Sequence, residues 1–321
     1  MKKIFKLMMI AVIGIFITGC GNKKEDKMTI ISTSFPGYDF ARAITKDSDI
    51  NVKMLLKPGT ETHDFEPTPQ DIKNIKNSDI FIYVGGDSDE WIEDVLDDID
   101  TKKTRIIKLM DLVNTVSEEH VEGMEEHEHE EHDYEEDEDH DHEEDEELDE
   151  HVWTSPKNAI TILTKLKNEI VLIDENNKEL YEKNTNSYIS ELNEIDSEIR
   201  NIVDNSNRKE IIFGDRFPIR YFVDEYGLSY YAAFPGCSEQ TEASAKTISF
   251  LIDKVKEDNI PVVFHIELSN GKIADAIAKE TNAKVLEFHA AHNISKKNFD
   301  AGVTYVDIMK RNINVLKEAL Q

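Results

Sequence analysis

Short apolar runs alternate with helical patterns along most of this 321-residue chain. The runs have the length and the β-branched and aromatic content of buried strands. They occupy residues 28–33, 52–56, 80–84 and 104–109 and, after a gap, residues 210–213, 229–234, 262–266 and 285–288. Because strands that alternate with helices build parallel βαβ units, the sequence predicts an α/β fold with mostly parallel sheets flanked by helices.

A continuous helical pattern separates the two sets of strands. A helix begins at Pro156, and beyond it apolar residues recur from Tyr181 to Ile202 at spacings of 7, 4, 3, 4 and 3 residues. At ~1.5 Å per residue, a helix of about thirty residues is long enough to span a domain. The sequence therefore predicts two lobes joined by one long rigid helix. The expected limits are an N-terminal lobe at 28–172, the connecting helix at 173–205 and a C-terminal lobe at 206–321.

The charge of the chain is concentrated in one segment. The 67 acidic and 37 basic residues give a formal charge of −30, and residues 118–150 alone hold 22 of the acids and no Lys or Arg. The rest of the chain has 45 acidic and 37 basic residues, a charge of only −8. A nucleic-acid binder needs a basic face to displace counterions, so the composition excludes nucleic acid as a partner.

The acidic insert, residues 118–150, also holds six histidines. It is nearly free of apolar residues and strongly self-repelling, which predicts a disordered loop when no metal is bound. Carboxylates alone would suffice for a solvated surface, whereas interleaved histidines bind transition metals weakly at several sites. The insert is therefore interpreted as a low-affinity metal-collecting loop. Its histidines are His120, His127, His129, His132, His140 and His142.

The N-terminus is typical of a lipoprotein signal. Three lysines precede the apolar run Leu7–Thr18, which is too short to cross a bilayer as a helix. Small residues before Cys20 favour cleavage there and acylation of the cysteine. The sequence predicts a signal peptide at 1–19 and a lipid-anchored tether at 20–27. The protein is expected on the outer face of the cell membrane of a Gram-positive-type bacterium.

Only one other cysteine, Cys237, is present, so no intramolecular disulfide is expected once Cys20 is acylated. Cys237 lies in the turn-like segment Phe234–Ser238. A lone cysteine in such a place is more often a small buried residue than a soft metal ligand, and the buried interpretation is favoured.

Two histidines lie in loops that lead into helices. His63 follows the predicted strand at 52–56 and precedes a helix whose start is marked by Thr68–Pro69. His151 precedes the helix that begins at Pro156. Ligands bind to open α/β sheets in such loops, at the carboxyl ends of strands. One loop histidine is weak evidence for a metal site, but two in matching contexts indicate one.

The segments around these histidines resemble hallmark motifs of a known family. His63–Pro69 and Asp149–Pro156 are similar to two motifs of the zinc and manganese ABC-transporter solute-binding lipoproteins, which include the streptococcal metal-binding adhesins. Glu242–Lys246 followed by Val262–Phe264 resembles the second-lobe pattern of this family. The similarity extends from about residue 28 to the C-terminus. It implies two α/β lobes joined by a long backbone helix, with one metal ion in the cleft between the lobes.

The resemblance also implies the metal ligands. The two first-lobe ligands carry over to His63 and His151. The third family ligand, a His or Glu before a Tyr-Phe pair, matches Asp215 only if a one-residue gap is allowed. Asp215 is therefore the candidate third ligand, with a structural ion pair to Arg216 or Arg220 as the alternative.

The fourth family ligand falls after the predicted strand at 285–288. His289 and His292 both lie there, and their spacing of three would place them on one face of a helix. His292 has the better place if His289 completes the strand. Glu267 and His265 alternate along another strand that ends near the same cleft. Glu267 is open as a ligand or as an acceptor that orients a histidine, and His265 is open as a ligand or as a strand residue without a metal role.

Two or three imidazoles with one carboxylate suit Zn²⁺, and Mn²⁺, which prefers oxygen-rich sites, is the second choice. The resemblance implies a monomeric, non-enzymatic zinc-binding component of an ABC importer. Its permease and ATPase would be separate chains, because this chain contains no phosphate-binding loop of the GxxxxGK[ST] type. The rival class, an extracellular zinc hydrolase, is disfavoured because no His-Glu-x-x-His helix is present. A cell-adhesion role, known for some relatives, has no independent support in the residues.

Overall fold

The computed structural model describes residues 27–60, 65–125, 147–238 and 242–321. Several predicted functional residues lie outside these ranges. They are Cys20, His63, His127, His129, His132, His140 and His142. No helix within the described ranges is both long and apolar enough to span a membrane.

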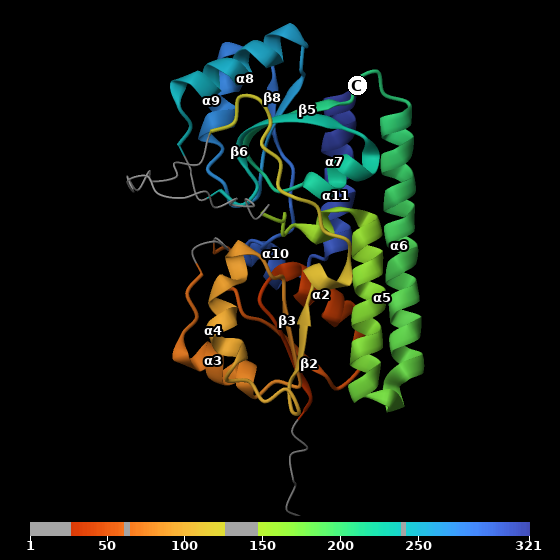
Figure 1. The fold of residues 1–321 in the computed structure, drawn as a ribbon. Helices are drawn as coiled ribbons and strands as arrows, with labels where there is room; N and C mark the ends of the chain where they lie inside the picture. Colours follow the sequence, from red (N-terminus) through yellow and green to blue (C-terminus); the bar gives the residue numbers. More distant parts are fainter. Residues whose placement is uncertain (1–26, 61–64, 126–146, 239–241) are drawn as a thin grey trace, which may run out of the picture.

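The first lobe is built on a four-stranded parallel sheet in the order β2-β1-β3-β4 (Figure 1). Alternate residues of the central strands belong to different cores: Ile30 and Ile82 pack in the large cluster, whereas Ile31 and Phe81 pack in a smaller one. Both faces of the sheet are therefore covered, as expected for parallel strands. The elements are β1 (Thr29–Ser32), α2 (Phe35–Ile44), β2 (Asn51–Met54), α3 (Pro69–Lys76), β3 (Ile80–Tyr83), α4 (Glu93–Leu96) and β4 (Arg105–Lys108).

The second lobe repeats this arrangement with a parallel sheet in the order β6-β5-β7-β8. In both sheets the first strand of the lobe lies between the second and the third, so the chain changes direction at the middle of the sheet. The crevice at the carboxyl ends of such strands is the usual ligand site. The elements are β5 (Glu210–Phe217), α7 (Arg220–Tyr226), β6 (Ser229–Pro235), α8 (Ala245–Glu257), β7 (Val262–His265), α9 (Lys272–Glu280) and β8 (Lys284–Glu287).

The predicted long helix is confirmed as α6 (Lys178–Asp204), which has 27 residues and runs along both lobes (Figure 1). It packs against α5 (Pro156–Ile173) and against α11 (Tyr305–Leu320). The recurring apolar residues that predicted α6 lie on the packed side of this helix, where Tyr181, Leu192 and Ile199 are buried. A single cluster of buried residues passes through both lobes, so the lobes share one continuous core.

The chain returns to the first lobe after β8. The backbone amide of Phe35 donates to the carbonyl oxygen of His292 at 3.3 Å. The ring of Phe299 in the short helix α10 (Lys296–Asp300) stacks on Tyr38 with the ring centroids 5.4 Å apart. Part of the predicted C-terminal lobe therefore packs on the N-terminal one, and the predicted domain limits stay a prediction.

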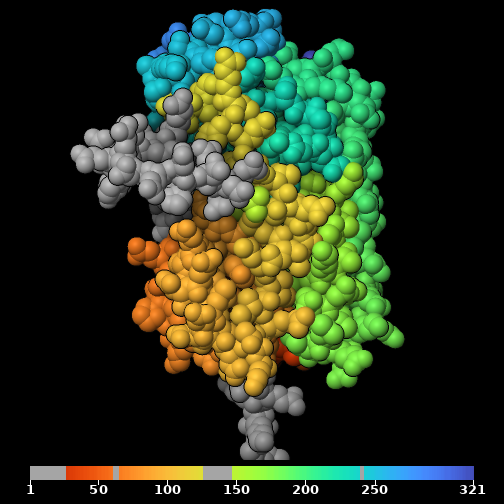
Figure 2. Space-filling model, in the orientation of Figure 1, coloured from red at the N-terminus to blue at the C-terminus, as the bar shows by residue number. Residues whose placement is uncertain are grey.

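The start of the acidic insert crosses to the second lobe, where it lies on the surface as the yellow segment of Figure 2. The backbone amide of Glu125 donates to Ala233 at 3.0 Å. Gly123 has a φ of +89°, and a Cβ there would overlap the ring of Phe250, so this contact requires glycine. At the other end of the insert, Leu148 forms an antiparallel bridge with Ser117. The predicted disorder of the insert concerns mainly residues outside the described ranges.

Candidate metal centre

His151 is wholly buried just before α5. The hydroxyl of Ser155 accepts from the amide of Asn158 and caps the helix, and Pro156 occupies its first turn. The Asp149 carboxylate accepts from the His151 backbone amide at 2.8 Å and lies 3.1 Å from the ring nitrogen Nδ1. This contact holds the ring proton on Nδ1 and leaves Nε2 as the acceptor or ligand atom. Nε2 is buried and has no hydrogen-bond partner among the described residues.

His292 and Glu150 complete a cluster around that nitrogen. The Nε2 atom of His292 is 3.6 Å from a carboxylate oxygen of Glu150. The centroids of the His151 and His292 rings are 5.0 Å apart. One ligand atom from each of the three residues lies within 4.8 Å of the other two. Two imidazoles and a carboxylate at this spacing can surround a single divalent cation.

Glu150 is a residue that the sequence did not single out. Its carboxylate accepts from the backbone amide of Ser88 at 3.1 Å and from the Ser88 hydroxyl. A Cβ on Gly86 would lie 2.6 Å from the Glu150 side chain, so the loop after β3 approaches it closely only because it has glycine there. Burial raises the pKa of Glu150. The sequence signal that could have pointed to Glu150 is its position beside His151. The contact with Ser88 could not be predicted from a local pattern, because Ser88 is 62 residues away.

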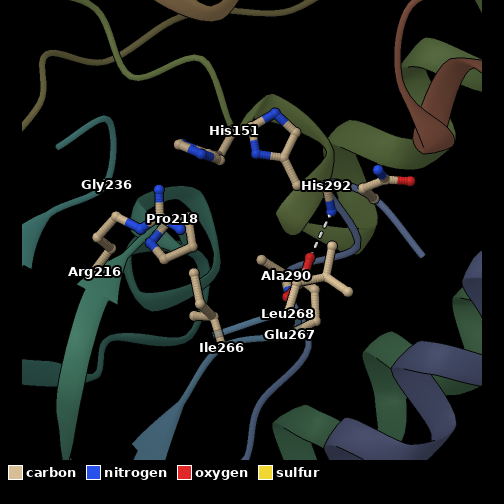
Figure 3. A pocket seen from close by; sticks show the side chains of 10 residues that line it. His151, Arg216, Pro218, Gly236, Ile266, Glu267, Leu268, Ala290 and His292 are labelled. Carbon is tan, nitrogen blue, oxygen red and sulfur yellow. Dashed lines mark hydrogen bonds between the residues drawn. The ribbon is translucent and has the colours of Figure 1, made fainter. Parts of the chain in front are cut away.

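A small cavity of about 20 Å³ opens beside the two histidines, enough for one ion or water (Figure 3). Apart from His151, its lining comes from segments that follow or end the strands of the second sheet, as expected for a site at their carboxyl ends. The lining residues are His151, Arg216, Pro218, Gly236, Ile266, Glu267, Leu268, Ala290, His292 and Asn293.

Glu267 lines the cavity and also holds the loop that presents His292. One carboxylate oxygen accepts from the amide of His292 at 2.9 Å and the other from Ala290 at 2.7 Å (Figure 3). Ala291, between them, has a φ of +62°. The segment is therefore not helical, and the condition for His289 and His292 to share a helical face is not met. Glu267 holds the loop through these two backbone hydrogen bonds, and its role as a ligand or as an acceptor that orients a histidine stays a prediction.

His289 and His265 have other neighbours. The Nδ1 atom of His289 accepts from the amide of Ala291 at 2.9 Å and lies 3.5 Å from Glu267. The Nδ1 atom of His265 lies 2.9 Å from the carbonyl oxygen of Ile266. Neither imidazole lines the cavity. Of the predicted second-lobe histidines, the structure brings only His292 together with His151.

Asp215 lies beside the cavity lining. Its carboxylate accepts from the amide of Arg216 at 2.9 Å and from Ile266 at 3.3 Å. The sequence predicted that the strand ends at Phe213, but β5 continues to Phe217 with an irregularity after Phe213. Successive residues of a strand point to opposite faces, so Arg216 lines the cavity and Asp215 does not.

The alternative role of Asp215 involved ion pairs with arginines. Arg220 pairs with Asp224 and, at 3.1 Å, with Glu119. The Arg216 guanidinium donates to the carbonyl oxygen of Ser238 at 3.4 Å. The two backbone hydrogen bonds of the Asp215 carboxylate favour a structural role, and its role as a ligand stays a prediction.

Comparison with known proteins agrees with this geometry. The family model described as "Zinc-uptake complex component A periplasmic" matches residues 30–319. The chain belongs to this family. It is 33% identical to the high-affinity zinc uptake system protein ZnuA of Bacillus subtilis, over 99% of this chain and 98% of that protein.

Two solved structures share the two-lobe fold. The metal-dependent lipoprotein YcdH of Bacillus subtilis superposes with a TM-score of 0.74 at 30% identity, covering 92% of this chain and 99% of that one. The Zn(II)-bound ZnuA-like domain of AdcA from Streptococcus pneumoniae has a TM-score of 0.73 at 25% identity, with 92% and 99% covered. The predicted fold class and family are thereby confirmed.

Proposed function

We propose that this protein is the extracytoplasmic solute-binding lipoprotein of an ABC importer and that it captures zinc between His151 and His292. The observation that carries the proposal is the buried, unpartnered Nε2 atom of His151, within 4.8 Å of ligand atoms of Glu150 and His292. A buried acceptor without a partner costs free energy unless a cation binds it. The family and the zinc-binding names of the relatives support the same cargo.

We propose His63, His151, His292 and a carboxylate as the ligands. The support for His63 comes from its neighbours. The side-chain amide of Asn293 donates to the carbonyl oxygens of Lys57 at 3.0 Å and of Thr60 at 2.7 Å. The chain that leads to His63 is therefore tied to the residue next to His292. Among the described residues, Glu150 is the carboxylate with a ligand atom within 4.8 Å of ligand atoms of both His151 and His292, and Asp215 remains the alternative.

The donor set favours zinc over manganese. Imidazole nitrogen with one carboxylate matches the tetrahedral preference of Zn²⁺, whereas Mn²⁺ prefers more oxygen ligands. Delivery needs a site that opens, and a small rocking of one lobe that pulls His292 away from His151 would open it. The transporter would then favour the open state.

The remaining assignments complete the proposal. Cys20 would carry the lipid that holds the protein outside the cell membrane, with 20–27 as the tether. A permease and an ATPase on separate chains would receive the zinc from a monomeric binding protein. The lobes would be 28–172 and 206–321, joined by 173–205. The family is one of transport proteins, which supports a role as a binding protein and not as an enzyme.

Calorimetry on the chain without residues 126–146 tests the primary site. This deletion retains Asp149, which contacts His151, and Glu150, which contacts His292. It also retains the hydrogen bond from Glu118 to Glu147 at the base of the loop. We expect one tight zinc ion per chain and much weaker binding of Mn²⁺. Absence of tight zinc binding by the folded variant would disprove the proposed function.

The same deletion tests the collecting role of the loop. We expect zinc uptake by cells to be unchanged when zinc is plentiful and to fall severalfold when zinc is severely limited, because the loop histidines raise the local metal concentration. Uptake of radioactive zinc at both concentrations measures this. Equal uptake by the deleted and complete proteins at limiting zinc would rule out the collecting role.

Zinc affinity is expected to fall as the pH falls. Burial acts to lower the pKa of His151, but the carboxylates of Asp149 and Glu150 outweigh it and raise that pKa overall. Burial raises the pKa of Glu150. Without zinc both groups therefore hold protons up to a higher pH than free side chains do, and zinc must displace these protons. Titrations at about pH 6 and about pH 8 measure the change, and equal affinities would contradict this proton competition.

A further inference from the structure

A second group of metal-ligating side chains lies where the two ends of the acidic insert meet. Glu118, Glu147 and Cys237 each present a ligand atom within 4.8 Å of the others. The backbone holds two of them together, because the amide of Glu118 donates to the carbonyl oxygen of Glu147 at 2.8 Å. The third is tied in by the amide of Cys237, which donates to a carboxylate oxygen of Glu118 at 2.9 Å.

Two buried atoms in this group have no partner among the described residues. Cys237 is only 7% exposed, its thiol is free, and none of the described side chains or backbone groups is hydrogen-bonded to it. The Oε2 atom of Glu118 is also buried and unpartnered. A buried carboxylate oxygen without a donor is unfavourable, and a cation at this point would satisfy it. These atoms distinguish the group from an ordinary exposed acidic cluster.

The group is separate from the primary cavity but adjoins it. None of its three residues lines that cavity, whereas Gly236, the neighbour of Cys237, does (Figure 3). A Cβ on Gly236 would lie 3.3 Å from the Cε1 atom of His151. A cation held by Cys237 is therefore one residue along the chain from the cavity wall and at the base of the metal-collecting loop.

We propose that Glu118, Glu147 and Cys237 form a second site for Zn²⁺ or a similar borderline divalent cation, which passes the ion between the loop and the primary cavity. The passing role rests on the proposed function, but the existence of the site does not. Thiolate and carboxylate are both zinc ligands, and three protein ligands leave a coordination position for water. Such an open site exchanges its ion more readily than a closed one.

Binding at this site requires the loss of the thiol proton. As the metal–sulfur bond forms, the S–H bond breaks and the proton passes to solvent, so the metal oxidation state is unchanged. The soft sulfur favours Zn²⁺ or Co²⁺ over Mn²⁺, which prefers oxygen ligands. The sequence-based interpretation of Cys237 as a small buried residue describes its burial correctly, and the proposed ligand role is additional.

Cobalt titration of the full chain carrying Cys20→Ala tests the proposal, because Cys237 is then the only thiol. A cobalt–thiolate bond gives an ultraviolet charge-transfer band that imidazole and carboxylate ligands do not give, whereas visible bands report the primary site as well. We expect the ultraviolet band to appear and saturate. Adding Cys237→Ser should abolish it and leave the visible bands of the primary site.

Two further variants test the carboxylate ligand. Glu147→Gln should weaken the cobalt affinity read from the ultraviolet band by about 10-fold or more. Glu122→Gln removes one negative charge from an exposed position of the same segment and should leave that affinity unchanged. Circular dichroism checks the fold of each variant. Because Glu147 is exposed, its variant remains informative even if Cys237→Ser does not fold.

Three results would overturn the proposal. If the visible bands saturate without the ultraviolet band, the second site does not exist and the proposed function stands. If neither set of bands appears, both fail. If Glu147→Gln and Glu122→Gln give the same affinity as the parent chain, the carboxylates are not ligands and the site as proposed is wrong.

Discussion

Replacing His151 with alanine is expected to weaken zinc binding by roughly 100- to 1000-fold. A protein zinc site has a binding free energy of about 10–16 kcal/mol, so one ligand of four accounts for about 2.5–4 kcal/mol. His151 is wholly buried and its Nε2 atom has no other partner among the described residues, so no other described contact depends on that atom. Competition with a chelator of known zinc affinity measures the change.

The matched control is His265→Ala. His265 is also a histidine near the cleft, but its ring lies against Ile266 and Gly271 and does not line the cavity. We expect it to change zinc affinity less than about 3-fold, within the effect of a surface substitution. A His151→Ala variant that folds normally and binds zinc as tightly as the parent would remove His151 from the site.

The second large effect is expected at His292. Alanine at this position should also weaken zinc binding by roughly 100-fold or more, because an imidazole nitrogen of His292 lies within 4.8 Å of ligand atoms of His151 and Glu150. His289→Ala is the matched comparison. Its ring accepts from Ala291 and does not line the cavity, so we expect a loss below about 10-fold, arising from a looser loop.

This pair of variants decides between the two histidines that the sequence left open. Calorimetry on both proteins, with thermal unfolding to check stability, gives the ratio of the two affinities. A larger loss in His289→Ala than in His292→Ala would mean that the loop rearranges on zinc binding and that His289 is the ligand.

Local sequence signals predicted most of the elements. The helices α8 and α11 carry local start signals, because both begin at side chains that cap them, Ser244 and Thr304. The parallel sheets are also confirmed. The sequence could predict them because strands buried on both faces are apolar along their whole length. The short helix α10 was missed because its five residues are too few to show a helical period.

The end of β5 shows where local patterns fail. Gly214, Asp215 and Arg216 are neither β-branched nor aromatic, so the predicted strand stopped before them, yet all three are buried within β5. The Asp215 carboxylate accepts from the amide of Ile266, 51 residues away. A charged residue can occupy a buried strand because a distant backbone donor satisfies it, and no local pattern encodes that donor.

By itself the sequence determined the α/β class, the long helix and the acidic insert, and it predicted metal ligands at His151 and in the His289–His292 segment. These follow from periodicity, charge and motifs, which are properties of neighbouring residues. Only the tertiary structure decided that Glu150 lies beside His292, that Arg216 and not Asp215 faces the cavity, and that Glu118, Glu147 and Cys237 converge. The physical reason is that a metal site is a set of atoms a few ångströms apart, and residues distant in sequence reach that spacing only when the chain packs.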